Sequence, residues 1–565
     1  MKTIKSINYI YLINIVFLLL SLNVYSRNRD NYTPMSSFVI EQIPLDANNI
    51  NTWIINTGIF NQDLRVNNTP GFEWPRGAGS FAIFTTGLST AAYIDNVVTE
   101  AMCSYKGEYE PGYILDTEGM PLPLTDSRFK IYSVYTSNPN TYDWMHWGDM
   151  VPFGAPYTDI NHNGIYEPSI DMPGVTGASQ TIFVCLTDGF PETHQVGEGF
   201  GGGTSPLFAE VHMLCWSYNS TGLEDVNFIK WDIINKGNKP WNNAFFSIIC
   251  DPDLGCPNDD FIGSDTSLSL GYCYNGVNSD CSYQYRYPGI VPAVGITLLK
   301  GAVNKHISPN YSLNMTSFNY FVNTSTPSAD CEHDPNGEQI PAFYLMQGIK
   351  KDQTPWVVPP GGSENYVTKF CYPGDPYADT GWCEADGNPT GSVWNCGGPG
   401  IYTGPLYAPN LAGDRRFIIG TGSDNLMIDT GETQTIVIAQ MIAQGTSRKH
   451  SIYKLKQLCS NVRDFYLIGV NPISKEVPKD FYLFQNYPNP FNPTTNIKYQ
   501  ITKTSIVKIT VYDILGKEIV TLVNEKENSG IYEIQWNAVN FPSGVYFYKL
   551  TSNDFTETKK MVLLK

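Results

Sequence analysis

The sequence predicts a mostly β, multi-domain protein made of β-sandwiches with long irregular loops, and three observations support that prediction. Tyr is abundant, with 36 residues in a chain of 565, while Gly and Pro contribute 49 and 38. Tyr suits half-buried pleated strands, and Gly and Pro suit the turns between them. Short apolar runs bounded by turn residues recur along the chain, and one segment alone has a helical period. At ~150 residues per domain, the length allows roughly three or four domains.

The first 26 residues are expected to be a signal peptide. Lys2 and Lys5 precede an apolar stretch over residues 7–22, after which small residues lead into a polar segment. This order of charge, apolar core and small residues is typical of export signals. The apolar stretch is short for the ~20 residues of a membrane-spanning helix, so cleavage is favoured over a membrane anchor.

Residues 27–205 are expected to form an N-terminal β-rich region. The runs at 80–85 and 181–186 are apolar and are bounded by turn residues, as strands are. The net charge of the whole chain is −18. An acidic chain repels phosphate backbones, which argues against a nucleic-acid partner, but it can collect divalent cations.

Residues 206–466 are expected to form a second β-sandwich region with long loops rich in Cys, Gly and Pro. Two apolar runs at 226–234 and 244–250, separated by a Gly-Asn turn, predict a β-hairpin. Residues 320–412 are irregular, and a stretch of this length without regular structure would need disulfides or bound metal.

A single helix is predicted over residues 451–466. Ile452, Leu455, Leu458 and Val462 recur at spacings of three and four, which places them in one apolar stripe. We interpret this stripe as core packing. Residues 467–480 are expected to be a linker.

Cysteines are expected to staple the polar loops, because thiols can pair in an oxidising compartment. Spacing does not fix which cysteines pair. Alternatively, cysteines in apolar runs, such as Cys185 and Cys215, are buried free thiols. The disulfide candidates are Cys250, Cys256, Cys273, Cys281, Cys371, Cys383 and Cys396.

An acidic loop is the first candidate calcium site. Calcium takes six to eight oxygen ligands, which a tight loop supplies from alternate positions. The twelfth position, where a bidentate carboxylate is expected, is Ile170, and an acid follows one residue later. The alternative is a loop of Asx turns without metal. The candidate ligands are Asp159, Asn161, Asn163, the carbonyl of Ile165, Glu167 and Asp171.

A second, weaker calcium candidate follows the 244–250 run. Close carboxylates repel one another by up to ~1 kcal/mol per pair even in water, and a cation would remove that cost. A solvated acidic loop without metal is the alternative. The residues concerned are Asp251, Asp253, Asp259, Asp260 and Asp265.

Residues 481–565 are expected to fold as an immunoglobulin-like sandwich. A proline-rich segment opens this region and suits an extended entry into a sheet edge. Apolar and polar residues then alternate strictly at 497–501 and 507–511, as they do in strands with one wet face. About seven short strands with regular turns complete the pattern.

The same region contains an ordered set of motif residues that includes Tyr487, Pro488, Asn489, Pro490, Phe491, Gly516, Gly544 and Tyr546. Through these motifs it resembles the type A C-terminal sorting domain of type IX secretion cargo from Bacteroidota. The resemblance covers about 80 residues and rests on an ordered set of motifs. It implies passage through the inner membrane by the signal peptide, recognition by outer-membrane type IX machinery, removal of the domain, and surface attachment or release. The alternative is a structural module with no sorting role.

No motif in the chain predicts catalysis. No two of the seven histidines are three to five residues apart, and neither a G-x-S-x-G nor a P-loop motif is present. A glycosidase needs only two carboxylates that lie close together in the fold, and the sequence does not exclude such a pair. Loop tryptophans are able to stack on sugar rings. The leading hypothesis is therefore a non-enzymatic structural or adhesive protein of the cell surface. The alternative is a secreted protein that binds or hydrolyses polysaccharide, so glycans and other surface proteins are candidate partners. The loop tryptophans are Trp144, Trp147, Trp382 and Trp394.

Overall fold

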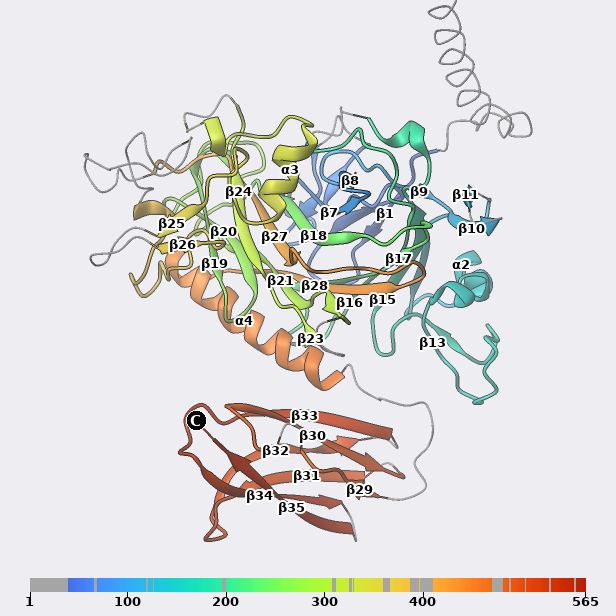
Figure 1. Cartoon of the computed structure of the whole chain (residues 1–565), viewed down its shortest axis with the longest axis vertical. Coiled ribbons are helices and arrows are strands. Elements are labelled where there is room, and N and C mark those ends of the chain that lie inside the picture. The colour runs from blue at the N-terminus through green and yellow to red at the C-terminus, as the bar shows by residue number, and fades with distance from the viewer. Residues whose placement is uncertain are drawn as a thin grey trace, which may run out of the picture.

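Two large antiparallel sheets form the body of the protein, and a smaller sandwich follows them (Figure 1). The mostly β, multi-domain prediction is confirmed. The predicted signal peptide and most of the predicted linker lie outside the described residues. The structure is a computed structural model that describes residues 39–65, 69–117, 120–124, 126–195, 200–306, 311–324, 328, 330–358, 366–386, 396, 410–469, 481–486, 489–503, 505–527, 530–552 and 555–564.

The larger sheet runs through the middle of the body. Its strands in spatial order are β12 (Tyr132–Tyr135), β15 (Gln180–Thr187), β16 (Ala209–Ser217), β17 (Val226–Asn235), β28 (Thr433–Ala443), β21 (Ala293–Lys300), β20 (Leu270–Asn275) and β19 (Asp260–Asp265), and β9 (Glu110–Pro111) also pairs with β15. The second sheet has the order β24 (Ser317–Phe321), β27 (Arg416–Gly422), β18 (Asn242–Asp251), β7 (Thr85–Ile94) and β8 (Val97–Ala101).

Both faces of the larger sheet are buried. Along β17, Ile229, Trp231 and Ile233 join a core that the five-stranded sheet completes, whereas Phe228 points to the opposite face. Successive side chains of a strand point to opposite faces, so alternation alone delivers apolar groups to both cores. The larger sheet is therefore the middle of three layers.

The predicted hairpin at 226–250 is wrong. The first run forms β17, which pairs with β16 and β28, while the second forms β18, which pairs with β7 and β27 in the other sheet. Each run has apolar residues on both faces, so the sequence does not indicate which face or partner a strand takes. The intervening turn carries the chain from one sheet to the other.

The boundary expected at residue 205 falls between hydrogen-bonded neighbours. β15 and β16 pair along their length, from Gln180 opposite Ser217 to Thr187 opposite Glu210. One core also contains residues from both predicted regions, including Leu88 and Ile248. The described parts of 27–205 and 206–466 thus share their sheets and their core.

Helix α4 (Arg448–Gly469) contains the predicted helix and extends it at both ends. Ile452, Leu455 and Val462 are fully buried, and the helix covers the face of the larger sheet opposite the five-stranded sheet (Figure 1). The Arg463 guanidinium donates to the carbonyl of Leu298 at 2.8 Å, which ties the helix to β21. The first residues of the predicted linker belong to this helix.

Two short helices and several small sheets complete the body, and α3 lies within the stretch predicted to be irregular. No helix among the described residues has the length and apolarity to cross a membrane. The helices are α2 (Tyr142–His146) and α3 (Gln339–Met346); the paired strands are β1 (Gln42–Leu45) with β2 (Thr52–Ile55), β3 (Gln62–Asp63) with β4 (Thr69–Pro70), β5 (Phe72–Glu73) with β6 (Phe81–Ile83), β10 (Tyr113–Thr117) with β11 (Met120–Leu124), β13 (Tyr157–Thr158) with β14 (Met172–Pro173), β22 (Val303–Asn304) with β23 (Tyr311–Ser312), and β25 (Trp356–Val358) with β26 (Tyr366–Thr368).

The C-terminal sandwich has its own core, built by the predicted alternation. Ile497 and Ile501 on one sheet and Val507 and Val511 on the other are fully buried around that core. Its further classification as immunoglobulin-like stays a prediction. One sheet contains β29 (Tyr482–Leu483), β30 (Thr494–Ile501) and β33 (Gly530–Asn537), and the other contains β32 (Glu518–Glu527), β31 (Ser505–Tyr512), β34 (Gly544–Ser552) and β35 (Phe555–Leu563).

Candidate functional sites

The acidic loop between β13 and β14 gathers most of its predicted ligands. The Asp159 carboxylate accepts backbone N–H groups of Asn163 at 3.2 Å and Gly164 at 2.7 Å. Glu167 Oε2 lies 2.7 Å from the side-chain amide of Asn161 and 2.6 Å from that of Asn163. Four oxygen-bearing side chains therefore converge, and backbone hydrogen bonds, led by that of Gly164, hold the pKa of Asp159 below its usual range.

Asp171, a candidate calcium ligand, accepts backbone N–H groups that close the loop. Its Oδ1 accepts the N–H of Ile160 at 2.9 Å, and its Oδ2 accepts the N–H of Glu167 at 2.8 Å. The residue is 2% exposed. Both oxygens are thus engaged in closing the loop. Ile165 donates its own N–H to Asn163 Oδ1 at 2.7 Å, which fixes the middle of the loop.

The second group of acids does not gather at one point. Asp251 and Asp253 lie together, with a third carboxylate from Asp414 within 4.8 Å. Asp265 pairs with Lys456 at 3.1 Å, and Asp260 is fully buried and accepts the N–H of Leu254 at 3.1 Å. Asp259 instead lies beside Cys256, Asp280 and Cys281. The sequence missed Asp414 because it comes from a distant segment of the chain.

An arginine already neutralises part of this cluster. Arg416 on β27 lies 3.2 Å from Asp251 Oδ1 and 2.7 Å from Asp414 Oδ1. Tyr105 donates to Asp251 Oδ2 at 3.0 Å. Burial, only partly offset by the Arg416 charge, raises the pKa of Asp251 to about 6.

Two disulfides staple the loops, Cys256–Cys281 and Cys331–Cys396. Three predicted candidates are therefore bonded, and the fourth bonded residue, Cys331, was not predicted. The remaining candidates are buried free thiols because they lie on strands or in packed segments rather than at loop tips. The free thiols are Cys103, Cys185, Cys215, Cys250, Cys273, Cys371, Cys383 and Cys459.

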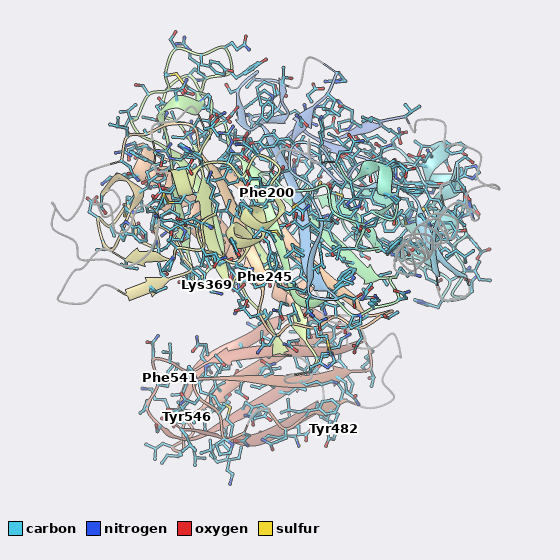
Figure 2. The ribbon with its side chains drawn as sticks, turned by 45° about the horizontal axis from the view of Figure 1, so that its top comes forward. Phe200, Phe245, Lys369, Tyr482, Phe541 and Tyr546 are labelled. Carbon is cyan, nitrogen blue, oxygen red and sulfur yellow. A yellow bond between two sulfur atoms is a disulfide. The ribbon has the colours of Figure 1, made fainter. Side chains whose placement is uncertain are left out.

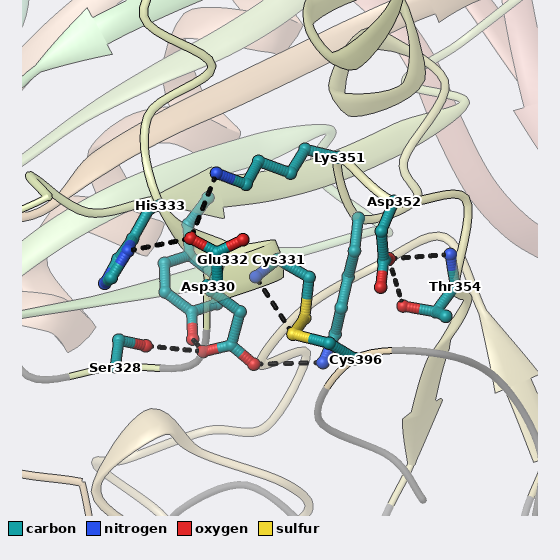
Figure 3. The surroundings of a disulfide bond; sticks show 11 residues. Ser328, Asp330, Cys331, Glu332, His333, Lys351, Asp352, Thr354 and Cys396 are labelled. Carbon is teal, nitrogen blue, oxygen red and sulfur yellow. Dashed lines mark hydrogen bonds and ion pairs between the residues drawn. A yellow bond between two sulfur atoms is a disulfide. The ribbon is translucent and has the colours of Figure 1, made fainter.

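A buried ion pair stands next to the Cys331–Cys396 bond (Figure 3). Lys350 Nζ lies 3.0 Å from Glu332 Oε1, with side chains 4% and 5% exposed. Tyr320 donates its hydroxyl to Glu332 Oε2 at 2.8 Å, and the Lys350 ammonium lies 4.4 Å from the centre of the Trp356 ring. Sequence spacing carries no signal for this network, because its members come from separate elements.

The predicted sugar-stacking tryptophans anchor loops. Trp144, Trp147 and Trp382 are 6%, 0% and 6% exposed. Trp144 donates its indole N–H to the carbonyl of Pro168 at 3.0 Å, and Trp147 donates to Pro156 at 2.8 Å. These three rings are not available to stack on a ligand. Trp394 lies outside the described residues.

In the C-terminal sandwich, the proline-rich entry segment closes the outer edge of β35. Phe491 donates its N–H to Val562 and accepts the N–H of Leu564, both at 2.9 Å. Asn489 Oδ1 accepts the N–H of Val562 at 2.9 Å. Open strand edges invite pairing with other chains, so this segment both fixes β35 and blocks its edge.

Aromatic rings from four segments pack beneath the same end of the sandwich. The Trp536 ring lies 5.5 Å from Phe491, 5.7 Å from Phe541 and 5.3 Å from Tyr546, measured between ring centres. The Tyr546 hydroxyl donates to the carbonyl of Pro542 at 2.7 Å, which holds the loop before β34. The entry segment, a loop and two strands are thus joined in one cluster.

Comparison with known protein families matches residues 485–564 to the family described as the secretion system C-terminal sorting domain. The C-terminal sandwich is a type IX secretion sorting domain. The protein is accordingly cargo of that system and is delivered to the cell surface or secreted. No curated protein matches the sequence.

Two solved structures show weak similarity to the chain. The first is a mutant of alpha-2-macroglobulin from Salmonella, at 8% identity and TM-score 0.13, over 85% of this chain and 26% of that one. The second is PorZ of Porphyromonas gingivalis, described as an essential surface component of the type IX secretion system, at 10% identity and TM-score 0.13, over 92% and 74% of the chains. This chain spans about a quarter of the length of the first. At these TM-scores neither similarity carries an argument.

The motif residues of the sorting domain shape its backbone. Gly516 has φ +78°, which suits a residue without Cβ, in the turn between β31 and β32. Gly544 begins β34, opposite Leu563 on β35. Phe491 and Tyr546 belong to the aromatic cluster, and Asn489 and Pro490 form the entry segment beside β35. Tyr487 and Pro488 lie outside the described residues.

The body contains a buried histidine between two acids that the sequence did not indicate. His194 Nε2 lies 2.8 Å from the carbonyl oxygen and 3.5 Å from Oδ2 of Asp188, and Nδ1 lies 3.4 Å from Glu108 Oε2. Burial lowers the pKa of His194, but the hydrogen bonds and charge of Asp188 and the charge of Glu108 outweigh it and raise that pKa to about 9. Burial raises the pKa of Glu108 to about 7.

We expect this arrangement to make stability fall with rising pH. The pKa of His194 is higher in the folded protein than its ordinary ~6.5. Its stabilisation is therefore complete below about pH 6.5 and is lost as pH rises through about 9, the folded value. The contribution of Glu108 to stability also falls with rising pH, over a lower pH range that ends at about pH 7. Between pH 6 and 9.5, the free energy of unfolding of His194→Gln should fall by about 3 kcal/mol less than that of the wild type, as measured by thermal unfolding.

The exposed His146 provides a matched control for this measurement. Its side chain is 46% exposed beside Asp149. His146→Gln should keep the wild-type pH dependence. Equal slopes for His194→Gln and the wild type would show that the buried histidine does not carry the effect.

Proposed function

We propose that the exported body is a non-enzymatic structural or adhesive component of the cell surface. The observation that carries the proposal is a set of exposed apolar side chains on the acidic loop and its flanks. Ile160, Ile165, Ile170 and Met172 are 51%, 65%, 41% and 41% exposed. Contiguous exposed apolar groups mark contact surfaces. These four side chains belong to one hydrogen-bonded loop and its flanks, at the edge of the body near β13 (Figure 1).

Adhesion of cells that display the protein tests this proposal. Ile160→Ser combined with Ile165→Ser should reduce adhesion or cell–cell aggregation, because the substitutions remove apolar contact area without touching the core. The unfolding temperature should stay unchanged. Unaltered adhesion, or hydrolysis of a polysaccharide by the purified protein in a substrate screen, would overturn the proposal. A positive glycan array would instead favour the polysaccharide-binding alternative.

We further propose that the acidic loop binds calcium through Asp159, Asn161, Asn163 and Glu167. The donors are carboxylate and amide oxygens, which calcium prefers. The amide oxygens of Asn161 and Asn163 accept the backbone N–H groups of Asn163 and Ile165, and each has a second lone pair to offer a cation. Asp171 then acts as the brace that closes the loop. Asp251 and Asp253 form a weaker candidate with Asp414, since Arg416 already compensates part of their charge.

Calcium should raise the unfolding temperature of the exported protein, and chelation should lower it. At a calcium concentration tenfold above Kd the stabilisation is about 1.4 kcal/mol, or roughly 1–2 °C for a body of this size. Differential scanning calorimetry with and without chelator measures it. Asp159→Asn should abolish the calcium response, whereas the exposed control Asp424→Asn should retain it. A calcium response that survives Asp159→Asn would exclude this loop as its source.

A further inference from the structure

The turn between β31 and β32 displays apolar side chains on a fixed backbone. Ile514 and Leu515 are 68% and 88% exposed. Asp513 Oδ1 accepts the N–H groups of Leu515 and Lys517, both at 2.9 Å, and the Asp513 carbonyl accepts the N–H of Gly516 at 3.0 Å. Exposed hairpin turns are usually polar, so two large aliphatic groups held outward in this way call for an explanation.

Strand pairing brings two further exposed apolar residues to the same end of the sandwich. Tyr512 at the end of β31 pairs with Phe547 near the start of β34, and β34 begins opposite Leu563. Val539, in the loop before β34, and Leu564, directly after β35, are 53% and 54% exposed. We call Ile514, Leu515, Val539 and Leu564 the apolar end of the sorting domain.

The residues that carry the sorting-domain motif build this same end. Asn489 and Phe491 hold the last residues of β35, and Gly516 shapes the turn that carries Leu515. Tyr546 fixes the loop that carries Val539 through its bond to Pro542. Figure 2 shows Phe541 and Tyr546 at one end of the domain and Tyr482 at the other. The motif therefore supports the backbone around the apolar end.

We propose that the apolar end is the surface by which outer-membrane type IX machinery recognises this protein, through a complementary apolar site. The proposal rests on the sorting role of the domain. A sorting domain must be read by the export machinery, and the motif residues that support this end are themselves largely buried or part of the backbone framework. The side chains that this end presents to a receptor are therefore the four that make up the apolar end. Apolar anchors of this kind commonly provide most of the affinity of an interface.

Export of full-length variants tests the proposal. Ile514→Ser combined with Leu515→Ser should lower the surface and medium fraction about tenfold and increase the periplasmic fraction, as expected if each side chain contributes to an interface hot spot. The matched control is Ile506→Ser, which removes an equally apolar residue that is 65% exposed at the opposite end, the start of β31. It should be exported as the wild type is. Both variants should unfold at the wild-type temperature.

A chain that lacks residues 481–565 separates failure of this proposal from failure of the sorting role. If the deletion is retained but the double variant is exported normally, the apolar end is not the recognition surface. Equal retention of Ile506→Ser would overturn the proposal as well. If the deletion itself is exported normally, the sorting role fails together with it.

Discussion

Replacing Trp536 with Ala should unfold the sorting domain and leave the protein inside the cell. Trp536 is 3% exposed, and its ring contacts Phe491, Phe541 and Tyr546. Truncation of a buried Trp to Ala costs about 3–5 kcal/mol, which is comparable with the whole stability of a small domain. The cluster joins the entry segment to the strands, so its loss also frees the edge of β35.

Limited proteolysis of the full chain and cell fractionation measure this effect together. Cleavage within residues 481–565 should become rapid, while the body stays resistant because it has its own cores. Tyr482→Ala is the matched control, since that aromatic ring is 44% exposed at the opposite end. It should preserve both folding and export. Normal export of Trp536→Ala would mean that the folded domain is not what the machinery reads.

Replacing Lys350 with Met should strongly destabilise the body. The substitution leaves the Glu332 carboxylate buried without its cation, and breaking a buried pair in this way costs about 3–5 kcal/mol. The segment joined by the Cys331–Cys396 disulfide lies beside this pair, so its protection against protease should fall as well (Figure 3).

The double variant Lys350→Met with Glu332→Gln shows whether charge is the cause. Removing both charges should recover much of the loss, because the remaining amide can still accept the hydroxyl of Tyr320. Chemical denaturation of four proteins, the wild type, Lys350→Met, Glu332→Gln and the double variant, gives the coupling free energy. A double variant no more stable than Lys350→Met would indicate lost packing against Trp356 instead.

The sequence was sufficient where local periodicity decides the structure. Alternation predicted the buried faces of β30 and β31 correctly. Of the four residues in the predicted stripe of α4, Ile452, Leu455 and Val462 are fully buried, and Leu458 is half-buried. Each of these segments has one apolar face. The pattern alone therefore fixes which face is buried.

Local periodicity failed where a strand has apolar residues on both of its faces. β17 and β18 resemble a hairpin in sequence, yet they lie in different sheets because each has buried neighbours on both faces. Partner choice is then set by contacts that are distant in the chain. The expected boundary at residue 205 falls between β15 and β16 for a related reason, because these two strands pair with each other.

Site residues were predictable only within a single loop. The spacing of Asp159, Asn161, Asn163 and Glu167 placed four oxygen-bearing side chains in one loop, and Asp171, one residue late in the pattern, accepts backbone N–H groups that close it. In contrast, Asp414 and Arg416 reach Asp251 only through the pairing of β18 with β27. No local pattern encodes such encounters between distant segments.

The most direct test of the central claim is the location of a chain that lacks residues 481–565 but keeps its N-terminal segment. Fractionation of cells that have a type IX system should find this chain in the periplasm, with its body folded and its disulfides formed. Finding it on the cell surface or in the medium at the level of the full chain would contradict the account.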